Sequence, residues 1–99
     1  MIFIETKTAL NDKKKIKSMA KSIQLKLLDM VTDIVSSPRS TESKGSPEQL
    51  KYSNIELWSR ELTKKDRIVY GIHPGTEFNM PNEPEVIVFY QYLGHYSDK

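Results

Sequence analysis

The sequence contains no cysteine and only two histidines among its 99 residues. The lack of cysteine excludes a disulfide framework and a thiolate site. Two histidines argue against a histidine-rich metal cage, and we expect neither a metal nor a cofactor. No apolar run approaches the length of a membrane-spanning helix, and the N-terminal stretch lacks the basic, apolar and small-residue order of a signal peptide. We therefore expect a cytoplasmic protein without membrane contact.

Length and charge indicate how many domains the chain forms and which kind of partner it binds. Ninety-nine residues suit a single domain spanning residues 1–99, with a modest core. The formal net charge is only +2, but lysines gather in the first 26 residues, at Lys7, Lys13, Lys14, Lys15, Lys17, Lys21 and Lys26. Such a block fits a basic helical surface that meets nucleic acid or an acidic partner. For any one of these lysines, a solvated helix face is the simpler interpretation.

The first third of the chain has a helical pattern. A helix is expected to begin near residues 6–10, with Thr6 or Thr8 as its cap. Apolar residues then recur at three- and four-residue spacing from Ile16 to Ile34. One long helix or two helices joined near residues 18–22 would both satisfy this pattern. Pro38 ends it.

Short segments around this helical region predict the strands of a small sheet. A first strand is expected at residues 2–4, and three more at residues 55–63, 66–72 and 86–93. Lys64 and Lys65 form a short turn, so the strands that flank them make an antiparallel hairpin. The last strand is apolar almost throughout, which predicts a central position, and Gly94 ends it. The resulting class is α+β, with helices on one face of a small antiparallel sheet and the other face open for function.

Alternation along the hairpin assigns side chains to the two faces of the sheet. Trp58, Arg60 and Leu62 share one face, and Ser59 and Glu61 lie on the other. By the same rule, Arg67 leaves the sheet on the face opposite the row of Ile68, Tyr70 and Ile72. We expect Trp58 and Tyr70 to lie in the core rather than to stack on bases.

Five polar residues could together act on a phosphodiester. Cleavage of RNA needs a base for the 2′-hydroxyl proton, an acid for the leaving 5′-oxygen and cations for the phosphate charge. Glu48 fits the base, and His95 fits the acid because its unperturbed pKa lies near neutrality. Arg67, helped by Lys51, fits the phosphate-binding cation. Tyr96 fits a group that orients the phosphate or stacks on a base.

Each of these residues also has a simpler interpretation when it is taken alone. Glu48 caps a loop or pairs with Lys51, Arg67 is a cation on the surface of a strand, and His95 is a surface histidine. His73 lies in a turn, and we interpret it as structural or solvated.

Three motifs, in this order, strengthen the catalytic interpretation. They are GSPEQLK at residues 45–51, LWSRELTKKDRIVY at residues 57–70 and GHY at residues 94–96. Together they resemble the YoeB/Txe family of toxin–antitoxin ribonucleases, within the RelE/ParE superfamily. The resemblance implies a RelE-like α+β fold and endoribonucleolytic cleavage of mRNA in the ribosomal A site.

The resemblance also implies residue roles and partners. It matches Glu48 to the general base, His95 to the general acid and Arg67 to the cation that stabilises the transition state, with Tyr96 in a supporting catalytic position. The expected RNA-binding residues are Lys51, Arg60, Lys64 and Lys65. The implied partners are the ribosome with its mRNA and a YefM/Axe-type antitoxin that covers the site. Operator DNA would be bound only through the antitoxin complex, and a homodimer is a further expectation.

Two departures from the family pattern leave alternatives open. The second arginine of the family's Trp-Ser-Arg-Arg is Glu61 here, and the histidine before the family's arginine is Asp66. If Glu61 faces the site, a carboxylate replaces a phosphate-binding cation. The first alternative is therefore a RelE-like module that binds ribosome or antitoxin without cleaving. A ParE-like toxin acting on gyrase is a weaker alternative, because such a toxin needs no acid–base pair.

Overall fold

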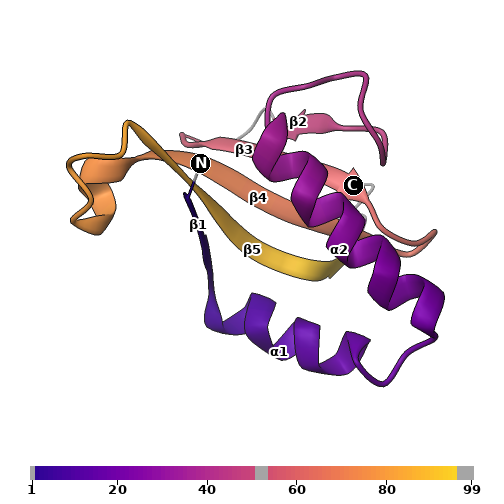
Figure 1. The fold of residues 1–99 in the computed structure, drawn as a ribbon. Helices are drawn as coiled ribbons and strands as arrows, with labels where there is room; N and C mark the ends of the chain where they lie inside the picture. Colours follow the sequence, from indigo (N-terminus) through magenta and orange to yellow (C-terminus); the bar gives the residue numbers. More distant parts are fainter. Residues whose placement is uncertain (1, 51–53, 96–99) are drawn as a thin grey trace.

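The computed structural model describes residues 2–50 and 54–95. Its elements are β1 (Ile2–Glu5), α1 (Lys7–Ile16), α2 (Lys21–Ser36), β2 (Glu48–Leu50), β3 (Glu56–Glu61), β4 (Asp66–Pro74), the 3₁₀ helix η1 (Gly75–Phe78) and β5 (Glu85–His95). The five strands form one sheet in the order β1-β5-β4-β3-β2 (Figure 1). Within the described ranges, no helix combines the length and the apolar character needed to cross a membrane.

The sheet is mixed, which corrects one part of the expected fold. The α+β class and the helices on one face are confirmed, and β2 to β5 pair antiparallel. β1, however, runs parallel to β5, with Ile2 opposite Val86 and Glu5 opposite Phe89. No short turn joins β1 to its neighbour, so local sequence does not fix its direction. β2 is also an additional strand, three residues long, in a segment for which the sequence predicts no strand.

The helical region consists of two helices rather than one. Thr6 caps α1, and its Oγ accepts a hydrogen bond from the Ala9 amide at 3.1 Å. α1 ends at Ile16, and α2 begins at Lys21. The Gln24 side-chain amide donates to the carbonyl oxygens of Lys17 and Met19, which lie between the helices. A side chain thus satisfies carbonyls that the end of a helix leaves without intrahelical partners.

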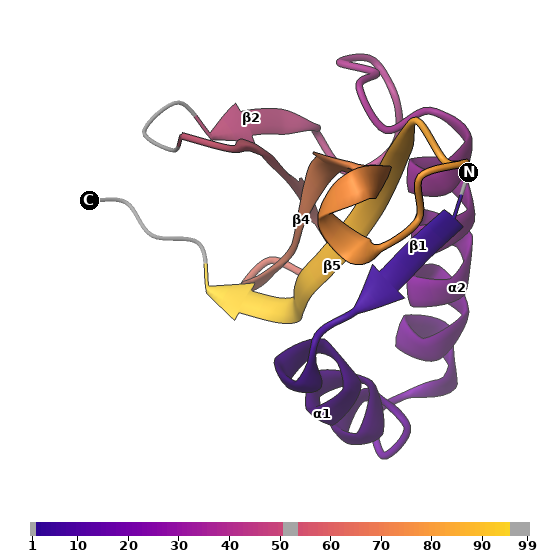
Figure 2. The same cartoon turned by 90° about the vertical axis from the view of Figure 1, so that its left-hand side faces the viewer.

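Both helices lie on the same side of the sheet, and the opposite face is uncovered by them (Figure 2). The core between the two layers joins α2 to the central strands and contains Leu27, Met30, Ile34, Trp58, Leu62, Ile68, Tyr70, Ile72, Ile87 and Phe89. Trp58 and Tyr70 are therefore core residues, as expected. The face away from the helices, called the open face below, remains for function.

α1 closes the edge of β5 where β1 no longer covers it. The Asp12 carboxylate accepts hydrogen bonds from the amides of Tyr92 and Leu93, at 3.0 and 3.1 Å. β5 does not end before Gly94, as the sequence predicts, but continues to His95. Its register against β4 shifts twice, between Arg67 and Tyr70, so that Gly94 lies opposite Arg67. The end of β5 therefore comes alongside the beginning of β4.

Candidate active site

A tight turn brings the segment before β2 against β3. Gly45 and Ser46 both have positive φ, 82° and 50°. A Cβ atom on Gly45 would lie 2.9 Å from the backbone carbonyl oxygen of Glu61, so glycine fits here for both conformation and space. The Gly45 carbonyl accepts from the Glu61 amide at 2.6 Å. This contact anchors the turn to β3, immediately before Glu48.

Arg67 is the centre of the contacts on the open face. Its Nε donates to Ser59 Oγ at 2.9 Å, and its Nη2 donates to the carbonyls of Ser46 at 3.0 Å and Ser59 at 3.3 Å. Only 12% of the Arg67 side chain is exposed. The guanidinium thus joins β4, β3 and the turn before β2, and its plane is fixed by acceptors on two sides.

Glu48 lies beside this guanidinium. Glu48 pairs with Ser59 across β2 and β3, and its Oε1 is 3.9 Å from Arg67 Nη2. Its side chain is 53% exposed, far more than that of Arg67. The carboxylate is therefore open to a ligand while an opposite charge lies next to it, an arrangement that suits proton abstraction beside a bound anion.

The end of β5 forms the other side of the site. The backbone of His95 lies opposite Asp66, and Gly94 lies opposite Arg67. A Cβ on Gly94 would be 3.0 Å from the backbone carbonyl oxygen of Arg67, which is a tight contact. The sheet thus brings the backbone of His95 next to the strand that carries Arg67. The His95 side chain, Lys51 and Tyr96 lie outside the described residues.

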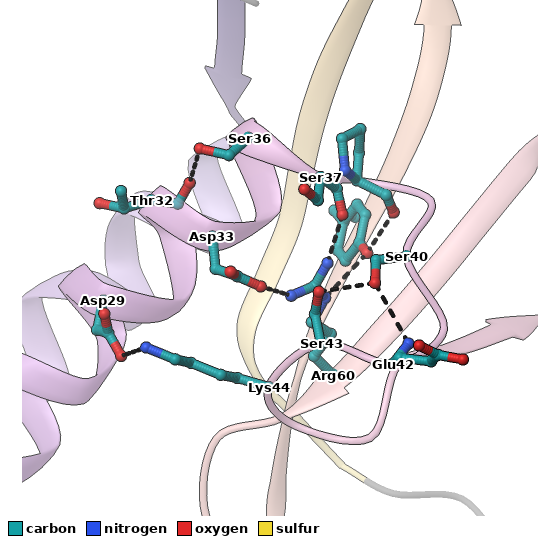
Figure 3. Close-up of polar contacts among 12 residues, drawn as sticks. Asp29, Thr32, Asp33, Ser36, Ser37, Ser40, Glu42, Ser43, Lys44 and Arg60 are labelled. Carbon is teal, nitrogen blue, oxygen red and sulfur yellow. Dashed lines mark hydrogen bonds and ion pairs between the residues drawn. The ribbon is translucent and has the colours of Figure 1, made fainter.

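Arg60 occupies a different position from the one expected. Its side chain is fully buried on the helix side of the sheet, where it pairs with Asp33 of α2 and donates to the Ser37 carbonyl at 2.7 Å (Figure 3). Its Nε also donates to the Tyr70 hydroxyl. The expectation that Arg60 contacts RNA is corrected, because a guanidinium held in the core does not reach a ligand on the open face.

The remaining cations and the two departures from the motif lie around the site. Lys64 and Lys65 are exposed in the turn between β3 and β4, where Thr63 Oγ accepts from the Lys65 and Asp66 amides. Glu61 lies directly opposite Arg67 in the register of β3 and β4. Glu61 is therefore on the same face as Arg67, so the substitution of a carboxylate for a cation falls within the site.

His73 is part of a separate polar cluster on the open face. Its side chain is 7% exposed, and its two ring nitrogens lie 2.9 Å from Glu77 Oε1 and 2.7 Å from the Tyr90 hydroxyl. The structural interpretation of His73 is confirmed, since these contacts tie η1 to the sheet. Its expected place in a turn is wrong, because β4 continues through His73 to Pro74. In the part of the chain that is described, no group of three or more His, Cys, Asp or Glu residues could hold a metal ion.

Two contributors to the site were not predicted from the sequence. Ser59 Oγ and the Ser46 carbonyl both accept from Arg67. For Ser59 a signal exists, since alternation places it on the same face as Arg67 in the predicted hairpin. For Ser46 there is none, because the contact depends on a backbone carbonyl in a turn with positive φ.

Comparison with known proteins assigns the chain to a family. Residues 5–93 match the family model described as YoeB-like toxin of bacterial type II toxin-antitoxin system. The toxin YoeB of Escherichia coli O6:H1 (strain CFT073) is 35% identical over 49 residues, which are 48% of this chain. The matched segment spans 58% of the length of that relative.

Solved structures share the fold over nearly the whole chain. The YoeB/ParE toxin from Agrobacterium tumefaciens superposes with a TM-score of 0.77 and 22% identity, covering 97% of this chain and 100% of that one. The toxin in a heterotetrameric YoeB-YefM toxin-antitoxin complex from Staphylococcus aureus gives a TM-score of 0.69 and 23% identity, covering 97% and 98%. At this level of identity, the two structures support the fold.

Proposed function

Because this chain belongs to the YoeB-like toxin family of bacterial type II toxin–antitoxin systems, we propose that it is a ribosome-dependent endoribonuclease that cleaves mRNA in the A site. The observation that carries the proposal is the position of Glu48 beside Arg67. Their side chains approach to 3.9 Å on the open face, and Arg67 is held by acceptors on β3 and the turn before β2. An exposed carboxylate next to a fixed guanidinium supports acid–base chemistry on a phosphate ester.

The proposed reaction is an attack of the ribose 2′-oxygen on the adjacent phosphorus. Glu48 accepts the proton of the 2′-hydroxyl as the new P–O2′ bond forms. Arg67 stabilises the charge that develops on the phosphate oxygens. The P–O5′ bond breaks, and His95 gives a proton to the leaving 5′-oxygen. The products are a 2′,3′-cyclic phosphate and a new 5′-hydroxyl end, and the reaction uses acid–base groups of the protein alone, with no metal and no cofactor.

Substrate contacts are assigned to groups around the site. Tyr96 orients the phosphate or stacks on a base, and Lys51, Lys64 and Lys65 contact the RNA backbone. The lysines of α1 and α2 would meet ribosomal RNA, because phosphate contacts dominate affinity for nucleic acid. Six of the seven lysines in that block are exposed, whereas Lys13 is half-buried and pairs with Glu5 at 2.8 Å.

The proposed protein partner is a YefM/Axe-type antitoxin that covers the active site, with operator DNA bound only through the antitoxin complex. A solved relative of the same fold forms a YoeB-YefM complex, which supports this assignment. We further propose that residues 1–99 act as one domain in the cytoplasm, and that the homodimer is an additional assembly of the same chain.

A module that binds without cleaving is the second candidate. The position of Glu61 opposite Arg67 favours it, because a carboxylate there opposes binding of a phosphate. The gyrase alternative has less support, since the closeness of Glu48 to Arg67 suits proton transfer rather than a contact with a protein target.

A primer-extension map on translating ribosomes tests the proposal. The wild-type protein is expected to create new 5′ ends at A-site codons, and these ends should carry a 5′-hydroxyl. Glu48→Gln, Arg67→Ala and His95→Gln should each abolish these ends and the toxicity, because loss of one positioned acid or base costs ~10²–10⁴ in rate. Thermal unfolding provides the control, and each variant should keep a cooperative transition. If wild type binds ribosomes or antitoxin but creates no new ends, the second candidate is correct.

A further inference from the structure

Ser59 is a buried hydroxyl in direct contact with the guanidinium of Arg67. Ser59 is 3% exposed, and its Oγ accepts from Arg67 Nε at 2.9 Å. In the sheet, Ser59 lies between Glu48 on β2 and Val69 on β4, so it faces Arg67 diagonally across β3 and β4. The small side chain of serine places a hydrogen-bond acceptor at this buried position. Alanine at the same position would leave the Nε–H of Arg67 without this acceptor.

The acceptors around Arg67 also determine how close it lies to Glu48. Ser59 Oγ accepts from Nε, while the carbonyls of Ser46 and Ser59 accept from Nη2, so the hydroxyl is the side-chain acceptor among these three contacts. The distance from Nη2 to the Glu48 carboxylate is then 3.9 Å, longer than a charge-assisted hydrogen bond. An arginine that loses the Ser59 hydroxyl would be able to turn its Nε toward Glu48 and to compete with the substrate for the carboxylate.

We propose that Ser59 is a positioning residue that holds Arg67 toward the substrate phosphate and away from a close ion pair with Glu48. The inference rests on the proposed nuclease function and deepens it, because it assigns a role to a side chain that does not itself touch the RNA. Ser59 acts through Arg67, so its effect must disappear when the Arg67 Nε–H is removed.

A double-mutant cycle tests this coupling. The full-length chain is prepared as wild type, Ser59→Ala, Arg67→Lys and the double variant, and kcat and KM are measured under multiple turnover on ribosomes programmed with mRNA. Ser59→Ala should lower kcat about tenfold with KM unchanged, since it removes one hydrogen bond to a charged group. In the Arg67→Lys background, the same substitution should have no further effect, because lysine has no Nε–H group.

Two further variants separate positioning from a merely structural role. Ser59→Thr keeps the hydroxyl acceptor and should recover most of the activity. Ser36→Ala removes an exposed hydroxyl that donates to the Thr32 carbonyl on α2 and should leave kcat unchanged. The inference is overturned if Ser59→Ala keeps the wild-type kcat, or if it costs the same factor in both Arg67 backgrounds. It is also overturned if the loss of activity simply follows a lower melting temperature.

A measurement without RNA distinguishes failure of this inference from failure of the proposed function. The Nε–H signal of Arg67 in a ¹H–¹⁵N NMR spectrum is assigned by its absence in Arg67→Lys. It should exchange slowly with solvent in wild type and in Ser59→Thr, and faster in Ser59→Ala. If wild type does not cleave RNA but this pattern holds, the nuclease function fails and the positioning of Arg67 by Ser59 stands. If the exchange rate does not change in Ser59→Ala, the positioning is refuted whatever the activity.

Discussion

Glu61 places a carboxylate on the same face of the sheet as Arg67. It lies opposite Arg67 in the register of β3 and β4, and its backbone amide holds the turn that precedes Glu48. The backbone contact does not depend on the side chain, so the charge at this position can be reversed without removing the anchor. The site thus allows a test of charge alone.

Replacing Glu61 with arginine should increase cleavage. If the chain cleaves RNA as proposed, Glu61→Arg exchanges a carboxylate for a cation on the face that carries Arg67, and we expect the cleavage rate to rise by roughly tenfold at low salt. The rate is measured by single-turnover cleavage on programmed ribosomes at two ionic strengths. Glu61→Gln is the matched control, and it should give an intermediate rate. A slower rate in Glu61→Arg than in wild type would contradict this account of the site.

For single residues, the sequence predicts the face of the sheet on which a side chain lies better than it predicts the function of that side chain. Alternation correctly places Arg60 with Trp58 on the helix face, and a charged residue on a core face indicates a buried partner. That partner is Asp33, which comes from α2. Sequence alone does not reveal it, because nothing local relates the two positions. The contact between Ser59 and Arg67 is hidden from the sequence for a similar reason, because it depends on the position of the Arg67 guanidinium in the folded sheet.

Helix α1 supplies a hydrogen-bond acceptor to the edge of β5 in addition to its packing contacts. β1 covers β5 only as far as Phe89. Asp12 then accepts from the amides of the next part of β5, at Tyr92 and Leu93. A side chain of a helix thus takes the place of a neighbouring strand, on the segment that leads to His95.

Removing the Asp12 carboxylate should therefore weaken the end of β5. Asp12→Ala leaves the buried Tyr92 amide and the partly buried Leu93 amide without this acceptor, and we expect a loss of about 2 kcal/mol in the free energy of unfolding. Urea unfolding measures this loss, and hydrogen exchange should show faster exchange at the Tyr92 and Leu93 amides. Asn11→Ala, at the exposed neighbouring position on α1, is the control and should change neither quantity. Unchanged protection of both amides in Asp12→Ala would refute the role given to this carboxylate.

The sequence predicts most helices and strands, but it does not predict how strands far apart in the sequence pair with one another. The hairpin of β3 and β4 follows from two strand-forming segments with a short turn, all of which lie close together in the chain. The parallel pairing of β1 and the short strand β2 depend on neighbours whose positions only the complete sheet defines. The end of β5 was also missed, since Gly94 reads as a strand breaker, whereas here it fits a crowded position opposite Arg67.

At the scale of the whole molecule, Arg39 connects three parts of the chain. From the loop after α2, its guanidinium donates to Glu56 at the start of β3 and to Glu85 at the start of β5. Hydrogen bonds from Arg39 hold the pKa of each of these carboxyl groups below its ordinary value of 4.5. In the folded protein, the two groups therefore remain charged at a lower pH than in the unfolded chain.

The contribution of Arg39 to stability should thus disappear in acid. A carboxyl group with a lowered pKa in the folded state stabilises the fold above its unfolded pKa, and this effect is lost as the pH falls through the folded pKa. Arg39→Ala should cost about 1 kcal/mol at pH 7, because the partly exposed charges are screened by solvent. The difference in melting temperature from wild type should shrink as the pH falls below about 4.5.

Lys44→Ala provides the control for this pH dependence. It removes an exposed pair with Asp29, and it should change the melting temperature little at any pH. A gap between wild type and Arg39→Ala that stays constant from pH 7 to pH 3 would show that the guanidinium acts by packing and not through the two carboxylates.

The parallel pairing of β1 with β5 has a consequence for the order in which the sheet assembles. Residues 2–5 find their place in the sheet only when residues 86–89 are there to pair with them, and pairing across such a sequence separation is slow. The hairpin of β3 and β4 joins strands that are close in the sequence, so it can form earlier. β1 therefore completes an edge of the sheet that the folding chain leaves open until late.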